Sequence, residues 1–448
     1  MDWNKLLSTK RLGKQDGDEA SAPEPRTEFT RDYDRVIFSS AFRRLQDKTQ
    51  VFPLAKSDYV RTRLTHSLEV ASVGRSLGMM AADEILRKDY SLKSIITPQD
   101  LGTIVATASL MHDIGNPPFG HAGESAIQEW FANSAIPSIK CMKKAEVMDL
   151  LKFEGNAQGF RTLSSLQNKH RRGGMQLTCA VLGGFSKYPR ESFVDESQKS
   201  GISGKKFGFM QSEAGLFEEL ADELGLKKKP GSGRAWFRHP LAYLVEAADD
   251  ISYHVMDVED GFKGGYLTFE QIEWLHKPWL DSKRLAKANA IPDLQRRAEY
   301  FRAVTIDQMI RSMIEAFRNN YDRIMDGSFD DELADHLDKA SDFKAFKDLA
   351  KKHVYSARPV VEVEACGFEV IGGLLSAFLG AMENVADPTA SEPSTKAKTI
   401  LRLLPGGEVD FAAKSAYERA VLAADYISGM TDSYAVDLYQ KIRGIALP

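Results

Sequence analysis

The sequence of 448 residues contains only three cysteines, Cys141, Cys179 and Cys366. Their odd number and wide spacing exclude a CxxC pair, so neither a disulfide framework nor a thiolate zinc site is indicated. An excess of positive charge is also lacking, because 59 Lys and Arg against 63 Asp and Glu give a net charge of −4. A nucleic acid or an anionic lipid would therefore need a local basic patch.

Long apolar segments are lacking as well. Residues 1–20 have no apolar core of the length that a signal peptide needs. The longest uncharged stretch, residues 370–382, is shorter than the roughly 18 residues that span a bilayer. We therefore expect a cytoplasmic protein with no membrane partner, and the scarcity of cysteine agrees with a reducing compartment.

Segments that alternate with a period of two are rare, and residues 360–365, VVEVEA, are the best strand candidate. Helical periodicity prevails instead, since apolar residues recur at i, i+3 and i+4 spacing in residues 241–262. Similar stripes occur in residues 64–80, 102–111, 300–324 and 412–439. The sequence therefore predicts a mainly α fold with at most a small β-hairpin.

Composition divides the chain into three parts. Residues 14–26 are polar and contain proline, which predicts a flexible N-terminal arm over residues 1–30. A core over residues 31–285 and a C-terminal helical region over residues 286–448 follow. Stretches rich in Gly, Pro, Ser and Lys predict surface loops at residues 197–206, 227–234 and 386–398.

Three of the nine histidines lie in contexts that carry chemistry: His66, the adjacent pair His112 and Asp113, and His121 with Glu124. Successive helical residues point about 100° apart, so an adjacent His and Asp can share one ion only near a helix end. The sequence Gly-Asn-Pro-Pro at 115–118 supplies such an end.

Two imidazoles and two carboxylates, the second carboxylate from Asp249 in the stripe 241–262, would form a site of mixed nitrogen and oxygen ligands. Such a site suits Mn, Mg, Fe, Ni or Co better than a structural zinc, and its open positions are typical of hydrolysis. The alternative for each histidine taken alone is a packed or surface residue. We assign no role to the other six, which are His170, His239, His254, His276, His336 and His353.

The residues around these groups form longer segments with a specific resemblance. They resemble the deoxyguanosine triphosphate triphosphohydrolases (dGTPases) of the HD superfamily of metal-dependent phosphohydrolases. The matching segments run from about residue 31 to residue 440, so the resemblance extends over nearly the whole chain. They are residues 31–52, 61–70, 110–124, 153–161, 239–261 and 425–440.

The resemblance implies a helical HD fold, with the catalytic core in residues 31–285, that cleaves a deoxynucleoside triphosphate into deoxynucleoside and tripolyphosphate. It also implies that His66, His112, Asp113 and Asp249 hold one divalent ion, with Mn²⁺ or Mg²⁺ favoured and Fe, Co or Ni as alternatives. Asp249 is preferred over Asp250 because it shares one helix face with Tyr253 and Asp257.

By the same resemblance His121 and Glu124 are an acid/base pair, and the direction in which His121 moves a proton stays open. The implied phosphate contacts are Arg63, Asn156, Lys187, Tyr188 and Lys206. For Lys206, a solvated surface run with Lys205 is an equally weighted alternative. The implied contacts to the deoxyribose are Gln50, Tyr253 and Asp257, and Val51 is a candidate for the base.

The expected activity is hydrolysis of dGTP first of all, in control of deoxynucleotide pools. The alternatives are a broad-specificity deoxynucleoside triphosphate triphosphohydrolase, an HD phosphodiesterase, and a regulatory module that senses nucleotides or single-stranded DNA. No P-loop is present, so a triphosphate is expected as substrate and not as fuel. The resemblance also implies a homo-oligomer, a hexamer in many relatives, and single-stranded DNA as a partner through residues 168–172 and 227–234, for which charged loops are the favoured alternative.

Overall fold

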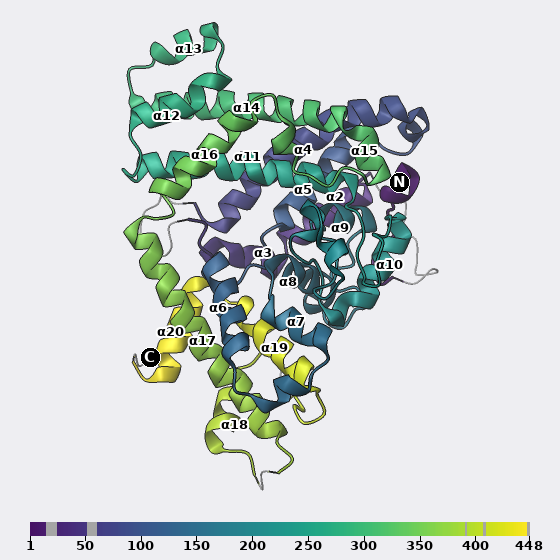
Figure 1. The fold of residues 1–448 in the computed structure, drawn as a ribbon, viewed down its shortest axis with the longest axis vertical. Helices are drawn as coiled ribbons and strands as arrows, with labels where there is room; N and C mark the ends of the chain where they lie inside the picture. Colours follow the sequence, from purple (N-terminus) through teal and green to yellow (C-terminus); the bar gives the residue numbers. More distant parts are fainter. Residues whose placement is uncertain (15–24, 52–60, 390–391, 406–408, 446–448) are drawn as a thin grey trace.

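The computed structural model describes residues 1–14, 25–51, 61–389, 392–405 and 409–445. Within these ranges the chain forms twenty α-helices, with short 3-10 helices and one π-helical turn (Thr162–Leu166) between some of them, and the only β pairing is four isolated bridges. The prediction of a mainly α fold is confirmed (Figure 1).

The strand predicted at residues 360–365 is wrong, because this segment lies in helix α17 (Arg358–Ala386). Pro359 stands in the first turn, where its missing N–H leaves no intrahelical bond unmade. Val360, Gly367 and Ile371 are buried at helical spacing on one face. Six residues of apparent alternation are thus overridden by a helical pattern that continues over the whole segment.

A larger hydrophobic core, formed by buried residues between Trp3 and Val354, occupies the upper half of Figure 1. Its centre is α4 (Arg63–Lys88), which lies against α5 (Pro98–Met111) and α11 (Pro240–Lys263). Around these helices lie α1 (Trp3–Leu6), α2 (Glu28–Ile37), α3 (Ser40–Arg43), α9 (Cys179–Phe185), α10 (Ala214–Leu224), α12 (Phe269–His276), α13 (Ser282–Asn289), α14 (Leu294–Asn319), α15 (Tyr321–Asp326) and α16 (Ala340–His353).

A smaller hydrophobic core, formed by buried residues between Phe119 and Leu438, lies below it. Here α17 packs against α6 (Gly120–Asn133), and the other members are α7 (Lys144–Leu151), α18 (Thr395–Leu401), α19 (Ala416–Ser428) and α20 (Asp432–Arg443). The short helix α8 (Gly155–Arg161) runs between the two cores, contributing Ala157 to the smaller and Phe160 to the larger. The two cores do not follow the boundary predicted at residue 285, since α6 joins the C-terminal helices while α14 and α16 join the larger core.

The N-terminal residues are part of the larger core. Trp3, Leu6 and Leu12 are buried, and the Trp3 indole N–H donates to the Tyr321 hydroxyl at 2.7 Å. The predicted flexible arm is therefore wrong for residues 1–13, because its apolar side chains find a buried partner surface. Residues 15–24 of that arm lie outside the described residues.

Helix α17 is long and apolar enough to cross a membrane by length and composition alone. Half of its most apolar stretch is buried inside the protein, where Ile371, Leu374 and Phe378 contribute to the smaller core. The same length and composition are typical of a central helix in a folded core.

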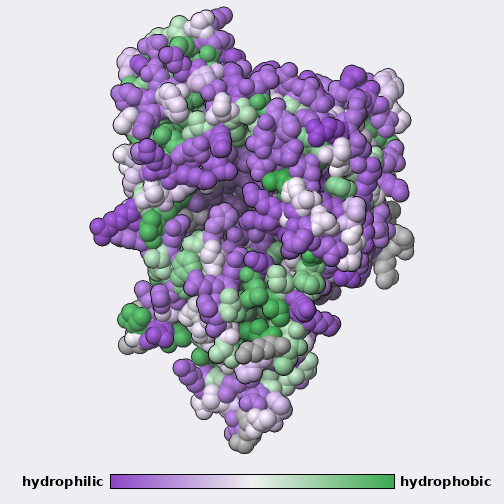
Figure 2. Space-filling view, in the orientation of Figure 1, coloured by the Kyte–Doolittle hydropathy of each residue, from purple (hydrophilic) through white to green (hydrophobic). Residues whose placement is uncertain are grey.

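Figure 2 shows one face of the molecule, with a hydrophilic hollow between its upper and lower parts. Apolar residues gather below this hollow, over α7 and α19.

Candidate active site

Three helices of the larger core bring the predicted ligand groups together. Helix α4 begins at Arg63, capped by the Thr62 side chain, so His66 lies in its first turn. Helix α5 ends at Met111, so His112 and Asp113 follow at its end, as the sequence predicts. Asp249 lies in the middle of α11.

The four side chains converge on one point. The Asp249 Oδ1 atom lies 3.2 Å from His66 Nε2 and 3.5 Å from His112 Nε2. The Asp113 Oδ2 atom lies 3.4 Å from His112 Nε2, and ligand atoms of His66, His112 and Asp113 lie within 4.8 Å of one another. The juxtaposition predicted from the sequence is therefore present, with Asp249 as the carboxylate that reaches both imidazoles.

The His112 ring is oriented as a metal ligand would be. Its Nδ1 lies 2.7 Å from the Ser109 carbonyl oxygen, which can only accept, so Nδ1 carries a proton in the neutral ring. Its Nε2 is buried and has no hydrogen-bond partner among the described residues. This nitrogen is directed toward two carboxylates by the hydrogen bond on the other ring nitrogen, an arrangement that fits a divalent ion in place of a proton.

The electrostatics of the cluster also favour a cation. Burial alone would lower the pKa of His112, but the neighbouring Asp113 and Asp249 carboxylates outweigh it and raise that pKa to about 9. Burial opposes the charge of Asp113, but Arg63 and His112 hold the pKa of this carboxyl well below its usual range. The two carboxylates thus remain charged and draw positive charge to the point between them.

Asp113 is held in one orientation by two donors. Arg63 donates through Nη1 to Asp113 Oδ2 at 2.5 Å, and Asn116 donates through Nδ2 to Oδ1 at 2.5 Å. Arg63, a predicted phosphate contact, is therefore at the site but is engaged with a candidate ligand. Its Nε is buried with no partner in the described parts of the chain.

A left-handed turn connects the adjacent His112 and Asp113, called the HD pair below, to helix α6. Phe119 has φ 62° and ψ 15°, and Gly120 has φ 56°. A left-handed conformation costs a residue with a side chain roughly 1–2 kcal/mol. At Gly120 a Cβ atom would also lie 2.5 Å from Arg63 Nη2, so the turn needs glycine there. The turn places His121 in the first turn of α6.

His121 and Glu124 form the predicted pair. His121 Nδ1 lies 2.9 Å from Glu124 Oε2, and Glu124 Oε1 accepts from the Gly155 N–H at 2.7 Å. Burial opposes the charge of Glu124, but His121 and Lys206 hold its pKa below the ordinary value. The His121 side chain is 81% exposed while that of Glu124 is 7% exposed, so a buried carboxylate orients an accessible ring.

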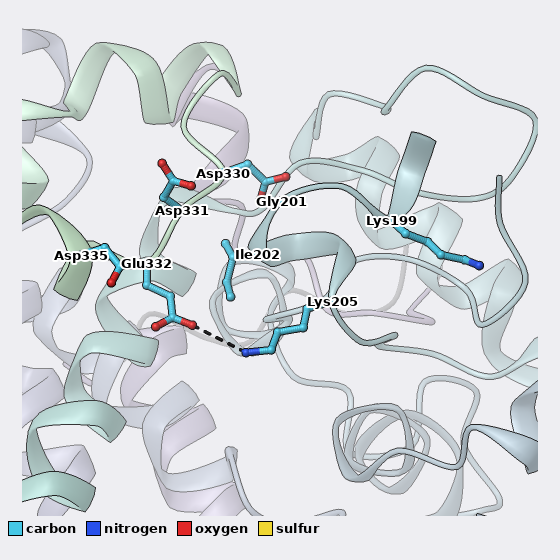
Figure 3. A pocket seen from close by; sticks show the side chains of 8 residues that line it. All are labelled: Lys199, Gly201, Ile202, Lys205, Asp330, Asp331, Glu332 and Asp335. Atoms are coloured by element: carbon cyan, nitrogen blue, oxygen red, sulfur yellow. Dashed lines mark ion pairs between the residues drawn. The ribbon is translucent and has the colours of Figure 1, made fainter. Parts of the chain in front are cut away.

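The two neighbouring lysines of the 197–206 loop point to different places. Lys206 donates to Glu154 at 2.9 Å and lies 3.9 Å from Glu124 Oε2. Lys205 instead lines a cavity of about 400 Å³ and faces Glu332 at 4.0 Å (Figure 3). Of the two, only Lys206 lies beside the acid/base pair.

The remaining predicted phosphate contacts have protein partners. Asn156 donates to Glu154 at 2.8 Å, next to Lys206. Lys187 pairs with Glu246 at 3.3 Å. Tyr188 is buried, with the Arg238 guanidinium 5.6 Å from its ring centroid. Asn156 and Lys206 therefore lie together, while Lys187 and Tyr188 surround the buried Arg238 and Glu246 pair.

The predicted sugar contacts on α11 have an additional neighbour. The Tyr355 hydroxyl donates to Asp257 at 2.6 Å, and its ring stacks on Tyr253 with centroids 5.7 Å apart. Burial raises the pKa of Asp257 well above its ordinary value, an effect that the Tyr355 hydroxyl partly offsets. Sequence reasoning missed Tyr355, which follows α16 in a segment without a recognisable motif.

Gln50 and Val51 end the described segment that precedes residues 52–60. The Gln50 Oε1 atom is buried with no hydrogen-bond partner within the described ranges, and Val51 is buried. Gln50 and Asp257 do not hydrogen-bond to each other in the part of the chain that the structure describes. An unpartnered buried amide oxygen is the kind of group that a bound hydroxyl would satisfy.

Comparison with known proteins identifies the family. Residues 63–192 match the HD domain, and residues 337–441 match the phosphohydrolase-associated domain. A deoxyguanosinetriphosphate triphosphohydrolase-like protein of Synechocystis sp. is 42% identical over 460 aligned positions that cover both chains completely. Proteins of the same description from Pseudomonas aeruginosa and Listeria monocytogenes are 38% and 35% identical, also over their full lengths.

This chain belongs to the dGTPase-like family of HD-domain phosphohydrolases. HD domains depend on a metal, and the cluster of His66, His112 and Asp113 is a candidate metal site in this phosphohydrolase. The HD match covers these three residues and His121 with Glu124, but it ends before Asp249. The fourth candidate ligand of the HD phosphohydrolase therefore comes from a helix outside the matched domain.

Proposed function

We propose that this HD phosphohydrolase uses His66, His112, Asp113 and Asp249 to hold a divalent ion, Mn²⁺ or Mg²⁺. We propose further that it hydrolyses deoxynucleoside triphosphates, dGTP most readily, to deoxynucleoside and tripolyphosphate in control of deoxynucleotide pools. The observation that carries the proposal is the buried Nε2 of His112, which faces Asp113 at 3.4 Å and Asp249 at 3.5 Å and makes no hydrogen bond within the described residues. The dGTP preference rests on the relatives, which are deoxyguanosinetriphosphate triphosphohydrolase-like proteins.

A bound divalent ion would supply charge neutralisation at the phosphoryl oxygens and a water that ionises near neutral pH. The chain supplies the orientation. Ser109 holds the His112 ring, while Arg63 and Asn116 hold the two oxygens of Asp113. These contacts keep the donor atoms fixed, so little reorganisation is needed when the substrate binds.

Proton transfer is assigned to His121. With its Nδ1 hydrogen-bonded to Glu124, the ring presents Nε2 to the outside and can carry a proton there. The Glu124 carboxylate stabilises the imidazolium when Nε2 is protonated. The proton is either given to the departing 5′ oxygen or taken from the attacking water, and a pH–rate profile distinguishes the two.

Contacts to the triphosphate and to the sugar are assigned to the groups around the candidate metal ligands. Lys206, Arg63 and Lys187 offer cationic donors, and the Asn156 amide adds a neutral one. Gln50, Tyr253 and Asp257 with Tyr355 are assigned to the deoxyribose, where a closely packed aromatic ring leaves no room for a 2′-hydroxyl.

The direct test is incubation of purified protein with Mn²⁺ or Mg²⁺ and each common deoxynucleoside triphosphate. The expected product, detected by ³¹P NMR or ion-exchange chromatography, is tripolyphosphate with free deoxynucleoside, formed fastest from dGTP. Pyrophosphate with deoxynucleoside monophosphate, or no turnover of any substrate, would overturn the proposal.

The proposed partners are further copies of this chain, up to a hexamer, and single-stranded DNA. Lys169, His170 and Arg171 are exposed and form the stronger basic patch. The second patch is weaker than its sequence indicates, because Lys229 is buried in an ion pair with Asp330 at 2.7 Å. Analytical ultracentrifugation tests the first partner, and an affinity for DNA that falls steeply with added salt tests the second.

A further inference from the structure

The end of α19 and the start of α20 contact segments that lie next to candidate site residues in the sequence. Both belong to the motif at residues 425–440, to which the proposed mechanism gives no role. Asp425 accepts from Arg161 twice, at 2.8 Å, and from Gln158 at 2.9 Å. Asp425 thereby fastens the end of α19 to α8, the helix that contains Asn156.

Asp432 makes the contact closest to the chemistry. This carboxylate is buried and is the first residue of α20. Its Oδ2 accepts from the Thr49 N–H at 2.9 Å and from the Thr49 hydroxyl at 2.5 Å. Its Oδ1 accepts from the Phe119 N–H at 3.0 Å. One carboxylate thus joins two segments that are distant in the sequence.

The two segments that Asp432 joins are adjacent in the sequence to residues of the proposed site. Thr49 precedes Gln50, and Phe119 precedes Gly120 and His121 in the left-handed turn. A second C-terminal helix bears on the same turn, because a Cβ atom at Gly367 of α17 would lie 3.0 Å from the Phe119 ring. The conformation of the turn is therefore held from outside the HD domain.

Lys48 makes a second connection between the C-terminal region and the candidate site. Lys48 is buried, and its ammonium donates to the Ser428 carbonyl at 2.8 Å and to the Asn116 carbonyl at 2.5 Å. Asn116 in turn holds Asp113. Backbone and side-chain contacts from residues 428–432 thus reach both the candidate metal ligand and the acid/base turn.

We infer that Asp432 is a positioning residue that sets His121 and Gln50 relative to the candidate metal ligands, so that the C-terminal region completes the active site. The inference rests on the proposed function insofar as His121 and Gln50 act on a nucleotide. An asparagine at position 432 has a single acceptor oxygen, so it leaves at least one of the three donors unsatisfied. In such a variant Asp425 still fastens α19 to α8, and α17 still packs on α6, so the loss is local.

Amide hydrogen exchange tests the contact without relying on activity. In Asp432→Asn, exchange is expected to rise by about tenfold or more in at least one of the peptides covering residues 44–51 and 117–124, since the single amide oxygen cannot replace both carboxylate oxygens. The matched control is Asp437→Asn on the same helix, an exposed acid paired only with Lys441 in the described contacts. Unchanged exchange in both peptides would overturn the inference.

Steady-state kinetics test the positioning. Asp432→Asn is expected to lower kcat by about 10²-fold with a smaller change in KM, because misplaced groups lose rate more than affinity. His121→Ala should cost less in the Asp432→Asn background than in the wild type, and additive effects of the two changes would contradict the inference.

Thr49 provides a milder pair of variants in case Asp432→Asn does not fold. Thr49→Ser keeps the hydroxyl donor and should retain the wild-type kcat, whereas Thr49→Val removes it and should lose about tenfold. Equal rates for the two variants would count against the role of Asp432. If the wild type hydrolyses no deoxynucleoside triphosphate, the proposed function fails, and the exchange measurement still decides whether Asp432 holds the two segments.

Discussion

The larger and the smaller core contribute different halves of the candidate site. All four candidate ligands lie on α4, α11 or the end of α5, which belong to the larger core. His121 and Glu124 lie on α6, whose buried residues belong to the smaller core. Neither core holds a complete set, so the chemistry depends on how the two are joined.

Two kinds of buried acid occur in the molecule. In the larger core, Asp113 lies against the buried cation Arg63, and Glu246 against Arg238. Beside the smaller core, Asp149 instead accepts from neutral donors, namely Ser192, the Gln211 N–H and Tyr417, at 2.6, 2.7 and 2.5 Å. The cations keep the first two carboxylates charged. For Asp149, which has no cation beside it among the described residues, burial favours the protonated form, although its three hydrogen bonds favour the charged one.

Removal of a candidate ligand from the larger core should have the largest effect. His112→Ala and Asp249→Ala are expected to abolish both metal retention and turnover while the helical content persists. Metal analysis after dialysis, with circular dichroism of the same samples, measures this. His336→Ala, an exposed histidine outside the cluster, serves as the control, and wild-type metal content in either ligand variant would contradict the assignment.

Removal of the His121 ring, which lies on the smaller core, should leave metal binding intact. His121→Ala is expected to retain the ion and to lose about 10²-fold or more in rate, because only proton transfer is removed. Glu129→Gln, an exposed acid on the same helix, is the control. Metal loss in His121→Ala, or full activity, would contradict the assignment of metal binding to the larger core and of proton transfer to the smaller core.

The protonation of Asp149 should make stability depend on pH. Burial raises its pKa to about 7, an effect that hydrogen bonds from Gln211, Ser192 and Tyr417 offset in part and that Glu213 increases. The folded chain therefore holds a proton that the unfolded chain releases near pH 4, and stability falls as pH rises from about 4 to 7.

Asp149→Asn removes this dependence. Urea denaturation at pH 5 and pH 8 is expected to show a smaller loss of stability in Asp149→Asn than in the wild type, by about 2 kcal/mol. Asp437→Asn, which removes an exposed carboxylate, should follow the wild type. Parallel pH profiles for wild type and Asp149→Asn would contradict the buried, protonated carboxyl.

The smallest difference is expected between the two loop lysines. Lys206→Ala should lower kcat/KM by about tenfold, because a charged donor beside Glu124 is lost. Lys205→Ala should change it by less than about twofold, since a long ion pair at the surface contributes little. Comparable losses in both variants would mean that the loop contacts the substrate through its whole length.

Local chemistry in the sequence was sufficient for much of the site. The HD pair comes at a helix end because Gly-Asn-Pro-Pro follows it, and the four-residue steps from Asp249 to Tyr253 and Asp257 place them on one face of α11. Helical periodicity predicted the mainly α fold for the same reason, because it is written in neighbouring residues. It failed at residues 360–365, where six residues were too few to separate alternation from a helical stripe.

The sequence by itself thus determined the candidate site residues and the helices that present them. Only the tertiary structure decided that α6 packs with the C-terminal helices, that Tyr355 meets Asp257 across 98 residues, and that Asp432 meets Phe119 across 313 residues. Such contacts leave no periodic or spacing signal, because they arise from the packing of whole helices and not from the conformation of adjacent residues.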